Sequence, residues 1–154
     1  MDRIASFTVD HNVLVPGLYL SRRDGDTVTF DLRFKKPNTG DLLTNAQMHS
    51  VEHIIATFLR NSAEKDAVIY FGPMGCQTGF YLLVRNADDE KVIETVKEVL
   101  KATVAYEGPV FGASRKECGN YKEHDLPGAK AIATDMLAVL KDWNAAKMDY
   151  DYEV

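Results

Sequence analysis

The length, composition and charge of the chain already exclude several classes of protein. It has 154 residues, 45% of them hydrophobic, so we expect a single domain over residues 1–154 with a real core. The net charge of −5 predicts neither a nucleic acid nor an anionic membrane surface as a partner. No apolar run is long enough to cross a bilayer, and residues 1–12 lack a signal-peptide core, so we expect a cytoplasmic protein.

The first part of the chain predicts two strands joined by a turn. Ser6 and His11 come before them in a segment without a clear period, where both are ordinary polar groups on local sequence alone. Residues 18–22 are a candidate strand, followed by an Asp-Gly turn signal. Residues 28–34 then alternate apolar and polar, as in a strand with one buried face. On the opposite face, Arg33 is either a solvated arginine or an anchor for a substrate carboxylate or hydroxyl.

The segment from His49 to His53 reads H-x-x-E-H and lies in a predicted helix. Thr44 and Gln47 have the spacing of a capping box, so we expect this helix to begin near Thr44. At about 100° per residue, His49 and His53 stand one turn apart and Glu52 shares their face. Two imidazoles beside a carboxylate suit a divalent metal with a proton-transfer group, although the same spacing also occurs in helices with two ordinary surface histidines.

Both cysteines lie outside the apolar runs of the sequence. In a reducing compartment a disulfide between Cys76 and Cys118 is not expected, so metal ligation or catalysis gains weight over simple burial. Cys76 follows a Gly/Pro turn between two predicted strands, residues 67–71 and 79–84. Exposed backbone N–H groups in such a turn can favour a reactive thiolate.

Two more amphipathic helices are predicted in the second half of the chain. One covers residues 88–104, and the other follows D-L-P-G at residues 125–128. The apolar stripe of the latter consists of Ile132, Met136, Val139, Leu140 and Trp143. The acidic tail from Met148 is expected to fray. About four strands and three helices with single apolar stripes predict an α+β fold, a two-layer sandwich in which a largely antiparallel sheet has helices packed on one face.

Taken together, these motifs resemble those of the S-ribosylhomocysteine lyase (LuxS) family. The H-x-x-E-H motif alone is only moderately specific, but its combination with P-M-G-C-Q-T-G and a later Cys-Gly is highly specific. The matching segments run along nearly the whole chain: S-F-T-V-D-H at residues 6–11, D-L-R-F at 31–34 with Pro37 and Asn38, the H-x-x-E-H helix, P-M-G-C-Q-T-G at 73–79, E-C-G at 117–119 and H-D-L at 124–126.

The resemblance implies a metal site and an acid–base pair. Its metal ligands would be His49, His53 and Cys118, which would bind one Fe²⁺ per subunit, often replaced by Zn²⁺ or Co²⁺, with a water in the fourth position. The acid–base pair would be Glu52 and Cys76. The positions that match substrate-holding residues are Ser6, His11 and Arg33. The family forms homodimers with two sites at the subunit interface, so the N-terminal residues are expected to serve the partner's site.

The resemblance also implies a reaction. S-ribosylhomocysteine would be cleaved to homocysteine and 4,5-dihydroxy-2,3-pentanedione, the precursor of the quorum-sensing signal autoinducer-2, by metal-assisted carbonyl migration and β-elimination. The small-molecule substrate comes from the methyl cycle. Many relatives carry an acidic residue shortly before the Pro-Met-Gly-Cys turn, whereas residues 69–72 contain none here. The group that holds the homocysteine end of the substrate is therefore unassigned.

Two other functions fit part of the pattern. H-x-x-E-H also marks the inverzincins, so a small metallohydrolase is an alternative, although those enzymes are longer, use a distal Glu ligand and do not need Cys76. The other alternative is a structural metal site with four protein ligands, which would leave Glu52 without a role. Its ligands would be His49, His53, Cys118 and either Cys76 or His124. On its own, His124 is either an ordinary polar residue near a helix start or a group that supports a metal ligand.

Overall fold

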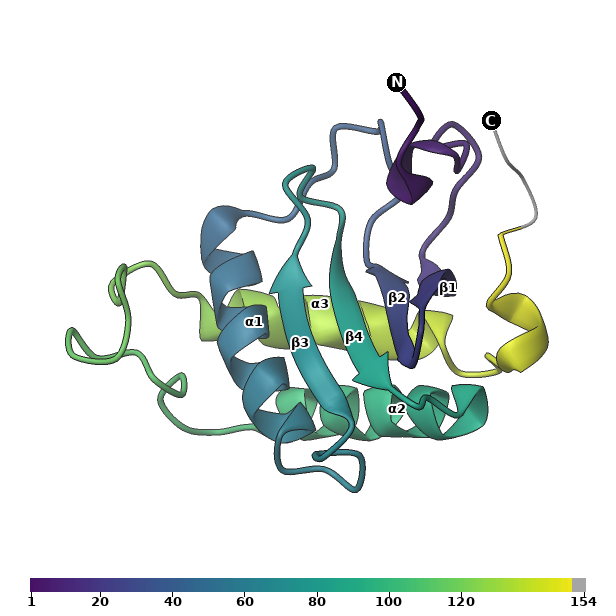
Figure 1. The fold of residues 1–154 in the computed structure, drawn as a ribbon. Coiled ribbons are helices and arrows are strands. Elements are labelled where there is room, and N and C mark those ends of the chain that lie inside the picture. Colours follow the sequence, from purple (N-terminus) through teal and green to yellow (C-terminus); the bar gives the residue numbers. More distant parts are fainter. Residues whose placement is uncertain (151–154) are drawn as a thin grey trace.

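The fold is built on a four-stranded sheet in which every strand pair is antiparallel. The computed structural model describes residues 1–150. The strands follow the order β1 (Gly17–Asp24), β2 (Thr27–Arg33), β4 (Gly79–Arg85) and β3 (Val68–Pro73) across the sheet (Figure 1). Gly25 adopts φ +60° between β1 and β2, a conformation that glycine reaches without a steric penalty. The predicted turn after Asp24 is therefore confirmed.

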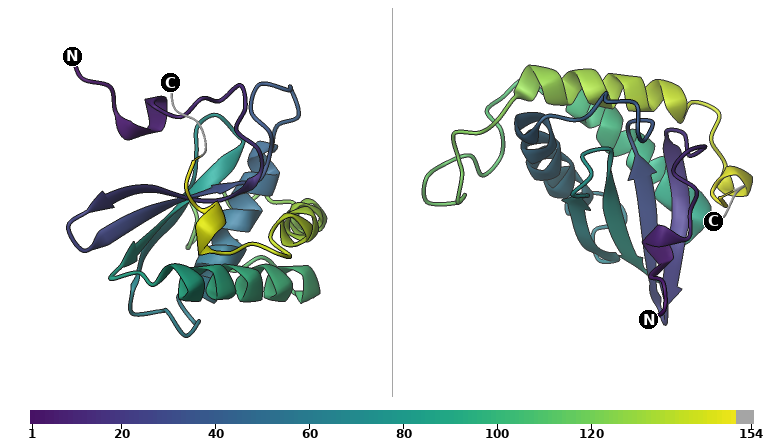
Figure 2. Two further views of the ribbon diagram at one scale, coloured as in Figure 1. Left: turned by 90° about the vertical axis from the view of Figure 1, so that its right-hand side faces the viewer. Right: turned by 90° about the horizontal axis from the view of Figure 1, so that it is seen from above.

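Three helices cover one face of this sheet. They are α1 (Asn45–Leu59), α2 (Asp89–Ala105) and α3 (Leu126–Val139). The N-terminal segment lies on the other side of the sheet from α3, as the view from above shows (Figure 2). The α+β sandwich predicted from the sequence is confirmed. No helix among the described residues is long and apolar enough to span a membrane.

Side-chain caps fix where each helix begins. Thr44 and Gln47 form the predicted capping box at the start of α1, with side chain and backbone bonded in both directions. The Asp88 carboxylate accepts a hydrogen bond from the Lys91 N–H at the start of α2. Asp125 does the same for the Gly128 N–H at the start of α3. These caps fix the residue at which each helix begins. They thereby position the functional side chains of α1 and of the segment before α3.

The core lies between the sheet and the three helices. Each helix contributes one apolar face, and β2 and β4 contribute the side chains that point towards the helices. The predicted buried face of β2 is confirmed, because all of its apolar residues are buried. The largest fully buried side chains include Phe30, Leu32, Ile54, Ile55, Phe80, Leu82, Leu100 and Met136.

Three details differ from the sequence-based expectation. The opposite face of β2 is not solvated, because Asp31 and Arg33 are both buried. Val139, the last residue of α3, is 37% exposed, whereas Leu140 beside it is fully buried. The tail does not fray at Met148, which is 1% exposed and whose carbonyl accepts a hydrogen bond from the Leu20 N–H of β1. The rest of the predicted fraying tail, residues 151–154, lies outside the described residues.

Candidate functional site

Four potential ligand atoms converge between α1 and the segment before α3. They belong to His49, His53, Cys118 and His124, and they all lie within 4.8 Å of one another. The Cys118 sulfur is 3.3 Å from Nε2 of His49 and 4.0 Å from Nε2 of His53. All four side chains are half-buried. The structure thus brings together the three residues that the resemblance implies as metal ligands, and it adds a third imidazole.

Backbone carbonyls orient the two histidines of α1. Nδ1 of His49 donates to the carbonyl oxygen of Glu123 over 2.8 Å, and Nδ1 of His53 donates to that of Phe111 over 2.7 Å. A carbonyl oxygen only accepts hydrogen bonds, so Nδ1 carries the proton in both rings. Nε2 of each ring therefore presents a lone pair towards Cys118. This is the arrangement that supports a metal-binding histidine.

Cys118 reaches the histidines from the irregular segment between α2 and α3, which lies beside α1 (green in Figure 1). Its sulfur accepts a hydrogen bond from the Asn120 N–H over 3.4 Å, a contact that also favours a thiolate ligand. Two imidazole nitrogens and one thiolate form a donor set that suits late first-row divalent metals better than Mg²⁺ or Ca²⁺. The residues present therefore fit an iron, cobalt or zinc ion.

Local sequence patterns did not establish that His124 belongs to this cluster. Its ring stacks on that of His49, with centroids 4.0 Å apart and planes inclined by 23°. Nδ1 lies 3.1 Å from Oγ of Ser50, while Nε2 is buried and has no hydrogen-bond partner among the described residues. Burial lowers the pKa of His124, and the neighbouring His49 and His53 lower it further. The sequence indicated His124 only through the matching H-D-L segment and as a possible fourth ligand of a structural site, and neither assigned its contacts.

Glu52 lies beside the cluster with a free carboxylate. It lines a hollow of about 290 Å³ together with His49, Pro73 and Asn120. The side chain is half-buried, and it makes no hydrogen bond or ion pair with any residue in the described part of the chain. A carboxylate in this position is available to move protons rather than to stabilise the fold.

The turn after β3 presents Cys76 at the end of the sheet. The Thr78 carbonyl accepts hydrogen bonds from the N–H groups of Phe34 and Lys35, which fixes the turn to the end of β2. A Cβ on Gly79 would lie 2.6 Å from the Leu32 carbonyl oxygen, so only glycine allows this close approach of β4 to β2. The packing of the turn leaves Cys76 exposed.

The other predicted substrate-binding residues gather around Cys76. Ser6, His11, Arg33 and Cys76 line one hollow of about 450 Å³. Pro73 lines both this hollow and the one that holds Glu52. The two groups of predicted site residues therefore occupy neighbouring hollows in a single chain.

Arg33 is not a solvated arginine. Its side chain is 3% exposed and makes two hydrogen bonds to the Asp31 carboxylate, of 3.1 Å from Nε and 2.6 Å from Nη2. Nη1 donates to Oγ1 of Thr78 over 2.8 Å and lies 3.8 Å from the Cys76 sulfur. Burial on its own would lower the pKa of Arg33, but the attraction of Asp31 outweighs it and raises the pKa. Its permanent positive charge therefore stands directly beside the Cys76 thiol.

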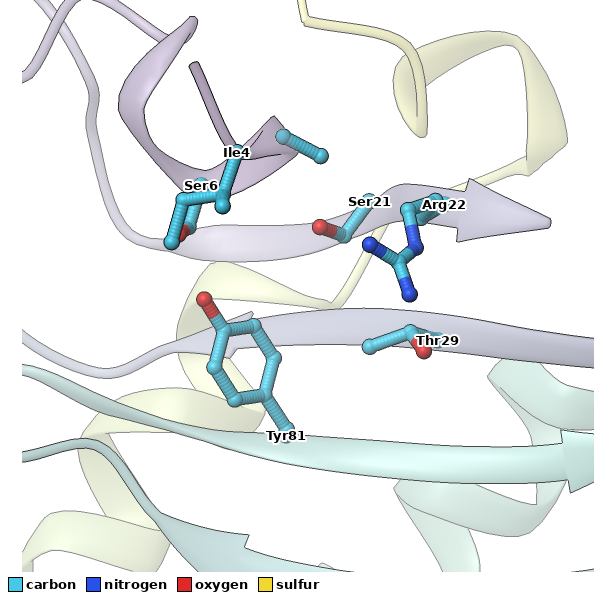
Figure 3. A pocket seen from close by; sticks show the side chains of 7 residues that line it. Ile4, Ser6, Ser21, Arg22, Thr29 and Tyr81 are labelled. Carbon is cyan, nitrogen blue, oxygen red and sulfur yellow. The ribbon is translucent and has the colours of Figure 1, made fainter. Parts of the chain in front are cut away.

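The N-terminal turn η1 (Ala5–Phe7) continues the lining on this face of the sheet. In Figure 3 the Tyr81 hydroxyl of β4 points towards Ser6 of η1, at one end of a further hollow of about 260 Å³. Burial raises the pKa of Tyr81, and the nearby Asp31 carboxylate raises it further. Ser6 is thus placed between two hollows, because it also lines the one that contains Cys76.

The fold and the cluster define a class of protein, an α+β domain with a half-buried His/Cys site and a free carboxylate beside it. The family model described as S-ribosylhomocysteinase (LuxS) matches residues 4–147, and this chain belongs to that family. Among its relatives, the S-ribosylhomocysteine lyase of Clostridium beijerinckii is 47% identical over 143 residues, covering 89% of this chain and 90% of the relative. Those of Borreliella afzelii and Finegoldia magna are each 43% identical, and each match covers 97% of this chain and 99% of the relative.

Proposed function

We propose that this protein is a metal-dependent S-ribosylhomocysteine lyase. The observation that carries the proposal is the convergence of His49, His53 and Cys118 beside the free carboxylate of Glu52. Relatives that match almost the whole chain bear the name S-ribosylhomocysteine lyase, which supports this substrate over a peptide. The products would be homocysteine and 4,5-dihydroxy-2,3-pentanedione, the precursor of autoinducer-2.

In this proposal His49, His53 and Cys118 hold one divalent ion per chain, natively Fe²⁺, with Zn²⁺ or Co²⁺ as substitutes. When bound, the ion supplies Lewis acidity, which stabilises negative charge on sugar oxygens by several kcal/mol. The carbonyls of Glu123 and Phe111 keep both Nε2 lone pairs turned towards the ion. Three protein ligands would leave a position open for the substrate, as in other catalytic sites and unlike closed structural ones.

The reaction needs groups that move protons next to a carbonyl. The carbonyl of the open-chain sugar must shift from C1 to C2 and then to C3, and each shift removes one proton and returns another. We assign these transfers to Glu52 and Cys76, each of which would contribute about 10²–10⁴-fold. Glu52 is also assigned to protonate the departing homocysteine sulfur. As a thiolate, Cys76 could accept hydrogen bonds from Arg33 and Thr78.

Ser6, His11 and Arg33 are proposed to hold the substrate around Cys76. The ion pair with Asp31 fixes the orientation of the Arg33 guanidinium, so that Nη1 faces the hollow. We further propose that two copies of the chain form a homodimer that completes each site at their interface. Exposed apolar side chains of the N-terminal segment support that assembly, since Phe7, which lines this hollow, is 65% exposed, and Val13 and Val15 are also exposed. The two free thiols fit the reducing environment of the cytoplasm.

The deciding experiment measures homocysteine release from S-ribosylhomocysteine, on protein purified without air and without chelator. Thiol release should stop when a chelator removes the metal and return when Fe²⁺ or Co²⁺ is added. Folded, metal-loaded protein that releases no thiol would overturn the proposed substrate. The alternative metallohydrolase would instead cleave peptides under the same conditions, so a peptide mixture serves as the parallel assay.

A further inference from the structure

Ser50 determines which nitrogen of His124 carries the proton. Oγ of Ser50 is fully buried and, among the described residues, has two partners: the Asp125 N–H at 2.7 Å and Nδ1 of His124 at 3.1 Å. The Asp125 N–H can only donate, so the hydroxyl accepts that bond. The single hydroxyl proton then has one available acceptor, which is Nδ1 of His124. A buried hydroxyl proton without an acceptor would cost about 1–3 kcal/mol, so Ser50 donates to His124.

This contact gives His124 the opposite tautomer to its neighbours. Because Nδ1 of His124 accepts the Ser50 proton, Nε2 of the neutral ring must carry the hydrogen. Carbonyl partners impose the reverse on His49 and His53, where Nδ1 carries the hydrogen and Nε2 is a lone pair. The same pocket therefore holds two rings set to bind a metal and one ring set to donate a hydrogen bond.

We propose that His124 is not a fourth metal ligand but a fixed hydrogen-bond donor to the oxygen atom that occupies the open position of the metal. Its Nε2 is buried and lacks a partner among the described residues. A ring nitrogen of His124 lies within 4.8 Å of the other potential ligand atoms. With an ion held by His49, His53 and Cys118, such an oxygen would belong to a water molecule or to a hydroxyl or carbonyl group of the substrate. The inference rests on the proposed function for the substrate, but the tautomer rests on Ser50 alone.

A donor fixed in this way has two consequences. It keeps the site at three protein ligands, so substrate oxygens can enter without displacing a side chain. It also stabilises negative charge on the entering oxygen, in the manner of a donor in an oxyanion hole, whose removal typically lowers kcat by about 10²–10³-fold. Ser50 then acts as a positioning residue, because it reaches the substrate only through the ring of His124.

The tautomer can be read directly by nuclear magnetic resonance. The chain has four histidines, so long-range proton–nitrogen correlations of isotope-labelled histidine can be assigned with single variants. In both the metal-free and the zinc-loaded protein, His124 should carry its hydrogen on Nε2. In the zinc-loaded protein, His49 and His53 should carry theirs on Nδ1. A zinc-bound Nε2 in His124, or a hydrogen on its Nδ1, would overturn the proposal.

Variants separate a donor from a ligand. His124→Ala should lower kcat by about 10²-fold, while zinc affinity, measured by competition with a chromophoric chelator, stays within about tenfold. His124→Gln places an amide N–H where Nε2–H stands and should recover part of kcat. Loss of zinc affinity by about 10²-fold or more in both variants would identify His124 as a ligand and refute the proposal.

Ser50→Ala tests the origin of the tautomer. Without the hydroxyl, His124 should populate both tautomers in the metal-free protein, and kcat should fall with little change in KM. Thr134→Ala is the matched control, because it removes an exposed helical hydroxyl whose one hydrogen bond within the described residues goes to the Lys130 carbonyl. If the wild-type protein neither binds zinc nor releases homocysteine, the proposed function fails. The metal-free spectra of wild type and Ser50→Ala still decide whether Ser50 sets the tautomer.

Discussion

The Tyr150 hydroxyl donates a 2.7 Å hydrogen bond to Oδ2 of Asp31, the same oxygen that accepts from Nη2 of Arg33. The end of the described chain is thus connected to β2 on the sheet face opposite the helices. Tyr150 also stacks on Tyr19 of β1, with ring centroids 5.0 Å apart. Asp31 is thereby shared between the C-terminal segment and the arginine that stands beside Cys76.

Tyr150→Phe should lower the free energy of unfolding by about 1.5–3 kcal/mol, since it removes a hydrogen bond to a charged, buried carboxylate. The change is measured by urea denaturation. Tyr70→Phe is the control, because Tyr70 is exposed and has no hydrogen bond within the described residues. Equal stability of the two variants would show that the contact between Tyr150 and Asp31 contributes nothing.

Because of Tyr150, we expect the free energy of unfolding to fall at alkaline pH. Burial raises the pKa of Tyr150 far above its ordinary value of 10.0, and the Asp31 carboxylate raises it further. The folded protein keeps this proton where the unfolded chain loses it, so stability should fall as the pH rises above about 10. Urea denaturation between about pH 9 and pH 11 should give a shallower decline for Tyr150→Phe than for wild type. Parallel declines would assign the loss to other groups, such as Tyr81.

Cys76→Ala should retain the metal and lose turnover. Cys76 lies outside the His/Cys cluster, and it is proposed to transfer protons during the carbonyl shifts. We expect kcat to fall by about 10²–10⁴-fold with an unchanged metal content. Homocysteine release and elemental analysis of the same sample provide both readouts. An active Cys76→Ala enzyme would refute the assignment of this thiol to acid–base chemistry.

Cys118→Ala should lose the metal, and it should lose activity as a consequence. The variant removes the only sulfur of the cluster, so metal affinity should drop by about 10²-fold or more, and activity should follow the metal content. Competition with a chromophoric chelator measures the affinity, with Cys76→Ala as the matched cysteine control. Full metal occupancy in Cys118→Ala would exclude this thiol as a ligand.

Glu52→Gln should bind both metal and substrate but stall before homocysteine leaves. The amide has nearly the shape of the carboxylate but cannot exchange a proton, so kcat should fall by about 10²–10⁴-fold while KM changes little. Glu94→Gln, an exposed glutamate of α2, controls for the loss of a charge. Turnover close to that of wild type would remove Glu52 from the mechanism.

Elements governed by local patterns could be predicted from the sequence. The capping box at Thr44, the alternation in β2 and the Asp-Gly turn each depend on residues a few positions apart, and all three are confirmed. The placement of His49 and His53 on one face follows from the helical period alone. Their proximity to Cys118 does not follow from it, because residues 106–117 form no helix or strand whose period could place Cys118. That pairing came from the resemblance of the motifs.

Contacts between distant parts of the chain could not be predicted. Nothing local indicates that Tyr150 reaches Asp31, or that Arg33 is buried rather than solvated. The same holds for His124, which lies before α3 and contacts Ser50, His49 and His53 of α1. In both cases the missing information was which polar groups share a buried space, and this depends on how the elements pack.

Three hydrogen bonds join α1 to the backbone of the irregular segment between α2 and α3: His49 to Glu123, His53 to Phe111 and Ser50 to Asp125. Two of these bonds come from the candidate ligand rings themselves. If the site takes an ion as proposed, we expect binding of the ion to order this segment, and part of the binding free energy would then offset the chain entropy lost on ordering. Amide hydrogen exchange in this segment should slow when the ion binds. The fraction of slowly exchanging protein would then measure how much of a preparation contains the metal.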